Sequence, residues 1–138
     1  MIITKGLFYM VDYWKLKIEL ISRIRALDEK LSQGINICIH CGVEGNHSPT
    51  GFHPKGEAID MHFEQGGEIF PPDAIFNFVL QNWFGGIGIY THWNNPGFHL
   101  DTGPIRTWWK KDNSGAVYTL GEFLDQYGLK HMAPGVTT

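Results

Sequence analysis

Residues 57–63 read EAIDMHF, and this alternation of apolar and polar side chains decides how we expect the chain to fold. Successive side chains of a β-strand point to opposite faces, so Ile59 and Met61 would pack on one side of such a strand. Asp60 and His62 would then lie on the other side. The stretch therefore predicts a strand with one face toward the core and one face that offers ligand groups.

A second stretch repeats the pattern further along the chain. Residues 98–102 predict a strand on which Phe98 and Leu100 share one face, whereas His99 and Asp101 share the other. An apolar segment at 87–90 and a polar turn precede it, which is typical of a β-hairpin. Two strands that each turn small and polar groups to one side could form the floor of a cleft.

The rest of the chain supplies helices and further strands. We expect helices over residues 12–33, 74–83 and 120–127, and additional strands over 35–41 and 106–111. The first helix shows apolar residues at steps of three and four, namely Trp14, Ile18, Ile21, Ile24, Leu27 and Leu31. Helices toward the two ends with hairpin-linked strands between them predict an α+β fold.

Bulk composition limits the classes of function. A chain of 138 residues with 43% apolar and 18% charged residues predicts one folded domain over 1–138, with a flexible tail over about 129–138. The net charge of −3 and the lack of long like-charge runs argue against nucleic acid or an anionic membrane as partner. No signal peptide is evident, so we expect synthesis in the cytoplasm unless a leader precedes this chain. The oligomeric state is left open.

The chain has two cysteines, Cys38 and Cys41, inside the strand expected at 35–41. Residues three apart on a regular strand point to opposite faces. We therefore expect two half-buried thiols that share neither a metal ion nor a disulfide.

Residues 53–60 read HPKGEAID and carry the strongest chemical pattern. His53 on a turn and Asp60 on the following strand can converge on one ion, because Gly56 lets the chain reverse between them. His99 is the candidate third ligand. Mixed nitrogen and oxygen ligands suit Zn²⁺, and three protein ligands leave a fourth position for water, as in catalytic zinc sites. Asp101 could orient His99 or accept a proton from zinc-bound water.

These residues resemble the HxxGxAxD signature of the M15 family of zinc peptidases, the D-Ala-D-Ala carboxypeptidase and L,D-endopeptidase group that shares its fold with the hedgehog signalling domain. The stretches at 86–90 and 98–106 resemble the branch of that family with an HxD motif. The resemblance covers about residues 35–109. It implies zinc ligands at His53, Asp60 and His99, a small α+β domain with an antiparallel sheet and flanking helices, and a peptidoglycan peptide as substrate.

The expected function is therefore zinc-dependent hydrolysis of amide bonds in cell-wall stem peptides, which is compatible with a phage or prophage lysis enzyme. Three positions depart from the family pattern: Gly51 replaces a serine, Glu44 replaces an arginine, and Pro96 replaces an acidic residue. Asp101 is then the candidate catalytic base, with His92 as the alternative. The rival function is an inactive, zinc-stabilised module that binds peptide or glycan, or a structural component of a virion.

Overall fold

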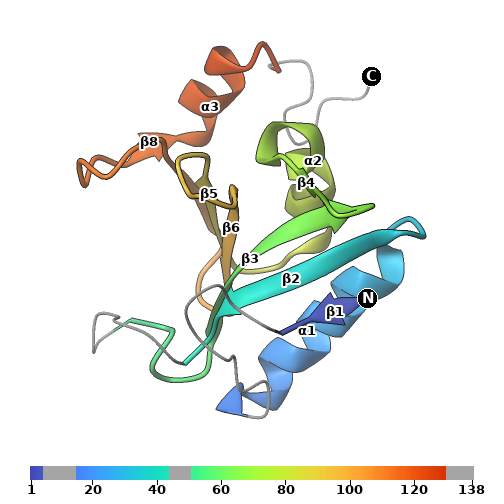
Figure 1. Cartoon of the computed structure of the whole chain (residues 1–138). Coiled ribbons are helices and arrows are strands. Elements are labelled where there is room, and N and C mark those ends of the chain that lie inside the picture. Colours follow the sequence, from blue (N-terminus) through green and yellow to red (C-terminus); the bar gives the residue numbers. More distant parts are fainter. Residues whose placement is uncertain (5–14, 44–50, 130–138) are drawn as a thin grey trace.

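The structure is a computed structural model that describes residues 1–4, 15–43 and 51–129. Within these residues the chain forms three helices and one mixed sheet of eight strands (Figure 1). The predicted α+β class is confirmed. The tail expected over residues 129–138 lies, apart from its first residue, outside the described part of the chain.

Most helices and strands begin and end close to the positions that the sequence predicts. The first helix is an exception, because it begins at Ile18 and not at residue 12, and Trp14 lies outside the described residues. In chain order the helices and strands are β1 (Ile2–Ile3), α1 (Ile18–Lys30), β2 (Ile35–Cys41), β3 (Ala58–Gln65), β4 (Glu68–Phe70), α2 (Pro72–Asn82), β5 (Gly86–Tyr90), β6 (Gly97–Asp101), β7 (Arg106–Lys110), β8 (Tyr118–Thr119) and α3 (Leu120–Gln126). The short strands β1, β4 and β8 were not expected from the sequence.

The sheet has the strand order β1-β2-β3-β6-β5-β7-β8, with β4 paired to β3. Strands β5 and β6 form the expected antiparallel hairpin, and β3 is antiparallel to both β2 and β6. The pairs β1–β2 and β5–β7 are parallel, so the sheet is not the purely antiparallel one that the resemblance implies. After β6 the chain returns past β5 and adds β7 on the far side of it, which gives β7 the direction of β5.

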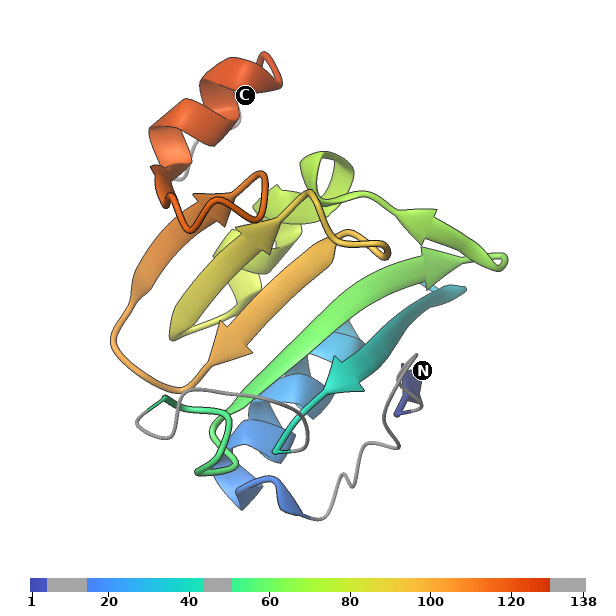
Figure 2. The ribbon, with the colours of Figure 1, turned by 60° about the vertical axis from the view of Figure 1, so that its left-hand side comes forward.

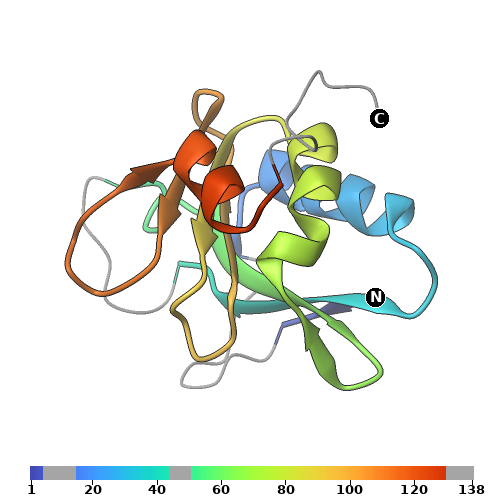
Figure 3. The same ribbon diagram turned by 90° about the horizontal axis from the view of Figure 1, so that it is seen from above.

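One face of the sheet packs against α1 and α2, which lie on the same side of it in Figures 2 and 3. The predicted core face of β3 is confirmed, since Ile59 and Met61 are fully buried. The stripe on α1 differs from the expected one: Ile18 is 82% exposed, and Leu20 is buried instead. Ile18 and Leu20 both fit the helical spacing, since Ile21 follows the first by three residues and Ile24 follows the second by four. Periodicity alone therefore does not decide which of the two is buried.

The other face of the sheet carries the polar side chains. The register pairs Asp60 of β3 with His99 of β6, and Ala58 with Asp101. Directly paired residues of antiparallel strands point to the same side, so the two ligand faces expected from the sequence coincide. In the described residues, no helix is long and apolar enough to cross a membrane.

Candidate metal centre

Three side chains meet on the polar face of the sheet, those of His53, Asp60 and His99. One ligand atom of each lies close to one ligand atom of each of the other two. Nε2 of His53 lies 3.1 Å from Nδ1 of His99, and Oδ1 of Asp60 lies 3.2 Å from each of these nitrogens. The three side chains are between 11% and 19% exposed, so they are shielded but not sealed from solvent. We call these three residues the triad.

The spacing of the triad fits a zinc ion. Two ligand atoms at about 2.0–2.1 Å from a tetrahedral zinc ion lie about 3.3–3.4 Å from each other. The three measured separations of 3.1–3.2 Å are slightly shorter, so a small outward movement of the side chains would admit the ion. Two imidazole nitrogens and one carboxylate oxygen are also a common donor set for zinc.

A tight turn holds His53 in position. Its backbone carbonyl accepts a hydrogen bond from the backbone N–H of Gly56, and its Nδ1 lies 3.0 Å from the carbonyl oxygen of Gly42. Gly56 has a φ of +73°, and a Cβ atom there would lie 2.7 Å from the backbone oxygen of Lys15. A residue with a side chain would therefore be strained at this position, in agreement with the reversal expected at Gly56.

Asp101 holds His99 from the side of the ring opposite the triad. Oδ2 of Asp101 lies 2.8 Å from Nε2 of His99, whereas Nδ1 of His99 faces Asp60. The Asp101 carboxylate is fully buried, and it accepts further hydrogen bonds from the backbone of Gly86 and from Arg106. This contact favours the orienting role that the sequence left open for Asp101, which stays a prediction. Its role as a base also stays a prediction.

The charges of this network reinforce one another. Burial alone would raise the pKa of Asp60, but hydrogen bonds from His53 and His99 outweigh it and hold that pKa well below its ordinary value. Burial also opposes ionisation of Asp101, yet its contacts with His99 and Arg106 lower the pKa of Asp101 to about 2. Although burial favours the neutral ring, hydrogen bonds to Asp101 and Asp60 raise the pKa of His99. Both carboxylates are therefore ionised at neutral pH, the form that binds metal.

The structure contradicts the expected placement of the two cysteines. Cys38 pairs with His62 and Cys41 pairs with Asp60, because His40 is an extra residue at a shift of register in β2. Both cysteines consequently point to the polar face, whereas strict alternation would separate them. The Cys41 sulfur and the ligand atoms of His53 and Asp60 lie within 4.8 Å of one another. Cys41 is thus a fourth ligand candidate that the sequence analysis missed.

Aromatic side chains flank the triad along β5 and β7. The rings of Trp108 and His99 are 5.3 Å apart, and Tyr90 stacks on Trp93 at 4.2 Å. A Cβ atom on Gly88 would lie 2.7 Å from Trp108, so this glycine lets the indole lie directly over β5. Trp109, which follows Trp108 and faces the opposite side, is buried in the core.

The contacts of His92, the alternative base, are with Tyr90, whose ring centroid lies 6.1 Å away, and with the backbone of Lys110. Its Nδ1 lies 3.1 Å from the backbone carbonyl oxygen of Lys110. Glu44, which replaces the expected arginine, lies outside the described residues. The described residues therefore offer a candidate metal centre whose histidines are held by outer contacts.

No family model, curated protein or solved structure matches this chain. The function must therefore be argued from the site itself.

Proposed function

We propose that the chain is a zinc-dependent hydrolase that cleaves amide bonds in the stem peptides of peptidoglycan. The observation that carries the proposal is the convergence of His53, Asp60 and His99 from separate parts of the chain, with donor atoms 3.1–3.2 Å apart. Hydrogen bonds alone also produce such separations, but two imidazole nitrogens that face one carboxylate oxygen are arranged like one face of a tetrahedral zinc shell. The similarity of residues 53–60 and 98–106 to zinc peptidases supports the same three ligands.

The chemistry follows from the donor set. A zinc ion held by the triad would polarise a substrate carbonyl and lower the pKa of a bound water toward about 7. His53 and His99 would each bind through the nitrogen that faces Asp60, while Gly42 and Asp101 hold the other nitrogen of each ring. These outer contacts fix the tautomer and the direction of each imidazole.

The surroundings of the triad suit a peptide substrate. Trp108 and Tyr90 are partly exposed beside His99, and Trp108 Nε1 donates a hydrogen bond to the Tyr90 hydroxyl at 3.3 Å. Arg106, which is ion-paired to Asp101, lies over the Trp108 ring at 4.8 Å and remains 41% exposed on its side chain. An exposed guanidinium beside an aromatic surface can bind a carboxylate, and stem peptides carry such groups.

The family resemblance adds three parts to this proposal: peptidoglycan as the substrate, a hedgehog-like fold, and release from the cytoplasm as in phage lysis.

Incubation of the zinc-loaded protein with purified peptidoglycan should release free amines. Asp60→Asn should abolish this release because it removes the charged ligand, and Asp112→Asn, at a partly exposed aspartate in the turn after β7, should not. Zinc-loaded, folded protein that releases no amines would contradict the enzyme.

One observation favours the rival function. Cys41 lies close enough to His53 and Asp60 for its thiolate to act as a fourth protein ligand. Zinc sites with four protein ligands are structural, whereas catalytic sites keep one position open. A closed site would make the domain a zinc-stabilised module that binds peptide or glycan, or a virion component, without hydrolysis.

A further inference from the structure

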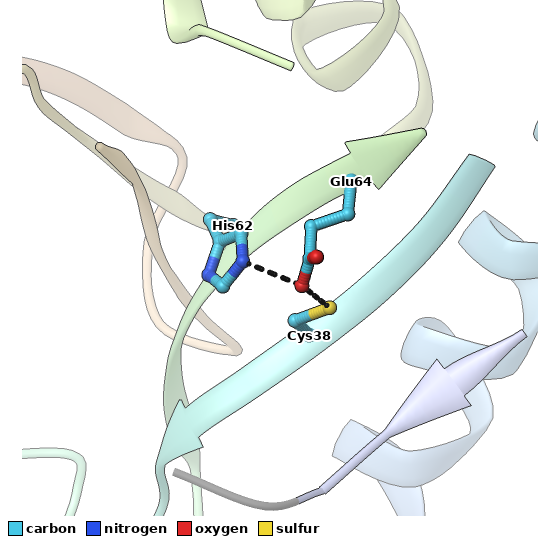
Figure 4. A group of neighbouring side chains, drawn as sticks. All are labelled: Cys38, His62 and Glu64. Carbon is cyan, nitrogen blue, oxygen red and sulfur yellow. Dashed lines mark hydrogen bonds and ion pairs between the residues drawn. The ribbon is translucent and has the colours of Figure 1, made fainter. Parts of the chain in front are cut away.

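A second group of ligand side chains lies on the same face of the sheet, farther along β2 and β3. It consists of Cys38, His62 and Glu64, which Figure 4 shows pointing toward one another. Oε2 of Glu64 lies 2.7 Å from the Cys38 sulfur and 3.0 Å from Nε2 of His62. The three donor atoms lie within 4.8 Å of one another, so small movements of the side chains would let one ion contact all three.

The regular part of the β2–β3 ladder fixes these positions. Cys38 and His62 are direct cross-strand partners, so their Cβ atoms lie about 4.5–5.5 Å apart. Glu64 follows His62 by two residues and therefore points to the same face. Cys38 and His62 are only 5% and 7% exposed, whereas the Glu64 side chain is 28% exposed. An ion could thus enter past Glu64 and then be shielded by the other two side chains.

The surroundings of this group contain polar atoms whose hydrogen-bonding capacity is not met. Nδ1 of His62 and Nε2 of His40 are buried and have no hydrogen-bond partner among the described residues. The two rings are neighbours, with centroids 5.2 Å apart. Buried polar groups of a purely structural network are nearly always paired, and exceptions concentrate where a protein binds something.

We propose that Cys38, His62 and Glu64 form a second zinc site, independent of the triad. A thiolate, an imidazole and a carboxylate are each established zinc ligands, and the thiolate disfavours Mg²⁺ and Ca²⁺. Three protein ligands leave one coordination position for water or another small donor. The three side chains lie on two adjacent strands, so the ion would link β2 to β3.

The two sites are too far apart for their ions to act together. Asp60 and His62 are two residues apart on β3, which corresponds to roughly 6.6 Å along a strand. Paired catalytic metals lie only about 3.5–4 Å apart. The second ion would therefore not bridge to the first, and its effect would be on the stability of the strand pair, because binding to the native state alone stabilises it.

Zinc content of the dialysed full chain, measured by elemental analysis, tests the proposal. We expect two zinc ions per wild-type chain and one per chain for Glu64→Gln, which keeps the shape of a partly exposed side chain. Glu68→Gln, at an exposed position on the neighbouring strand β4, is the matched control and should keep both ions. Cys38→Ser should also lose one ion.

Cobalt substitution gives a second readout that does not depend on stoichiometry. A thiolate bound to Co²⁺ produces a charge-transfer absorption, which should weaken in Cys38→Ser and in Glu64→Gln but not in Glu68→Gln. Equal zinc content and equal absorption in Glu64→Gln and wild type would overturn the second site, even if Cys38→Ser fails to fold. A single ion that depends on Cys38 and not on His99 would support this site and refute the triad instead.

Discussion

The triad and the Cys38–His62–Glu64 group both take ligands from β3, but they differ in how these ligands are held. Each histidine of the triad has its second nitrogen engaged, His53 by the Gly42 carbonyl and His99 by Asp101. In the second group, Nδ1 of His62 has no partner among the described residues. The triad is therefore preorganised for a metal ion, whereas an ion bound to the second group would itself have to fix the orientation of His62.

This difference predicts an order of affinity. Outer contacts that fix a ligand histidine typically change metal affinity by about 10- to 100-fold. The thiol of Cys38 must also lose its proton to bind, and burial, together with Glu64, raises the pKa of Cys38 to about 12. We therefore expect the triad to bind zinc first and the second group to fill at higher zinc concentration.

The largest expected effect is the loss of the triad ion in His99→Ala. The substitution removes one of three ligands and leaves Asp60 and His53 to hold zinc alone. Isothermal titration should show that the tighter of the two binding events has disappeared while the weaker one remains. Two unchanged binding events would contradict the assignment of the triad.

The next effect concerns the pH dependence of stability in the metal-free chain. Burial, with a smaller contribution from His62, lowers the pKa of His40 from 6.5 to about 4. Between these values the unfolded chain binds more protons than the native chain, so the free energy of unfolding falls as the pH falls. His40 accounts for up to roughly 3 kcal/mol of this decrease, at 1.36 kcal/mol per pKa unit.

Chemical denaturation of wild type and His40→Gln in chelator, at pH values between 7 and 4, would measure that contribution. The wild type should lose more stability than the variant over this window. Parallel curves would show that His40 titrates alike in the native and unfolded states.

A smaller effect is expected for Asp101→Asn, which separates the two roles of Asp101. If Asp101 orients His99, zinc affinity at the triad should fall about 10- to 100-fold, and turnover should recover at saturating zinc. We expect this result because Asp101 contacts the nitrogen of His99 that faces away from Asp60. Full zinc binding with turnover reduced by about 10²- to 10⁴-fold would instead assign proton transfer to Asp101.

The smallest effect is expected for Cys41→Ala. If the triad is the complete protein ligand set, zinc affinity and amine release should stay close to wild type. Cys38→Ala provides the matched comparison, because it should lose the weaker ion while the tighter one stays. A drop in affinity for the tighter ion in Cys41→Ala would show a closed site with four protein ligands and favour the inactive module.

Sequence alone was sufficient to place the triad, because each of its parts has a local signal. The alternation in 57–63 places Asp60 on the polar face, and the same pattern places His99. The glycine at position 56 marks the reversal that brings His53 back. Glu64 was missed, although extending the alternation of β3 by one step from His62 would have found it.

Features that depend on strand pairing could not be predicted from local sequence patterns. Strand β7 runs parallel to β5 because it is added beyond β5 and not beside β6, and no local pattern records that choice. The strands β1 and β8 have two residues each, which is too short for an alternation to be recognised. The faces of Cys38 and Cys41 depend on the register with β3 in the same way.

The irregularity at His40 also changes how many functional groups one strand can present. A regular strand places two side chains on a given face over residues 38–41, but the register shift places three there, Cys38, His40 and Cys41. Opposite them, β3 contributes Asp60, His62 and Glu64 by ordinary alternation. A single additional residue thus raises the density of candidate ligands along β2 and β3, because it brings Cys41 to the side of the sheet that carries Asp60.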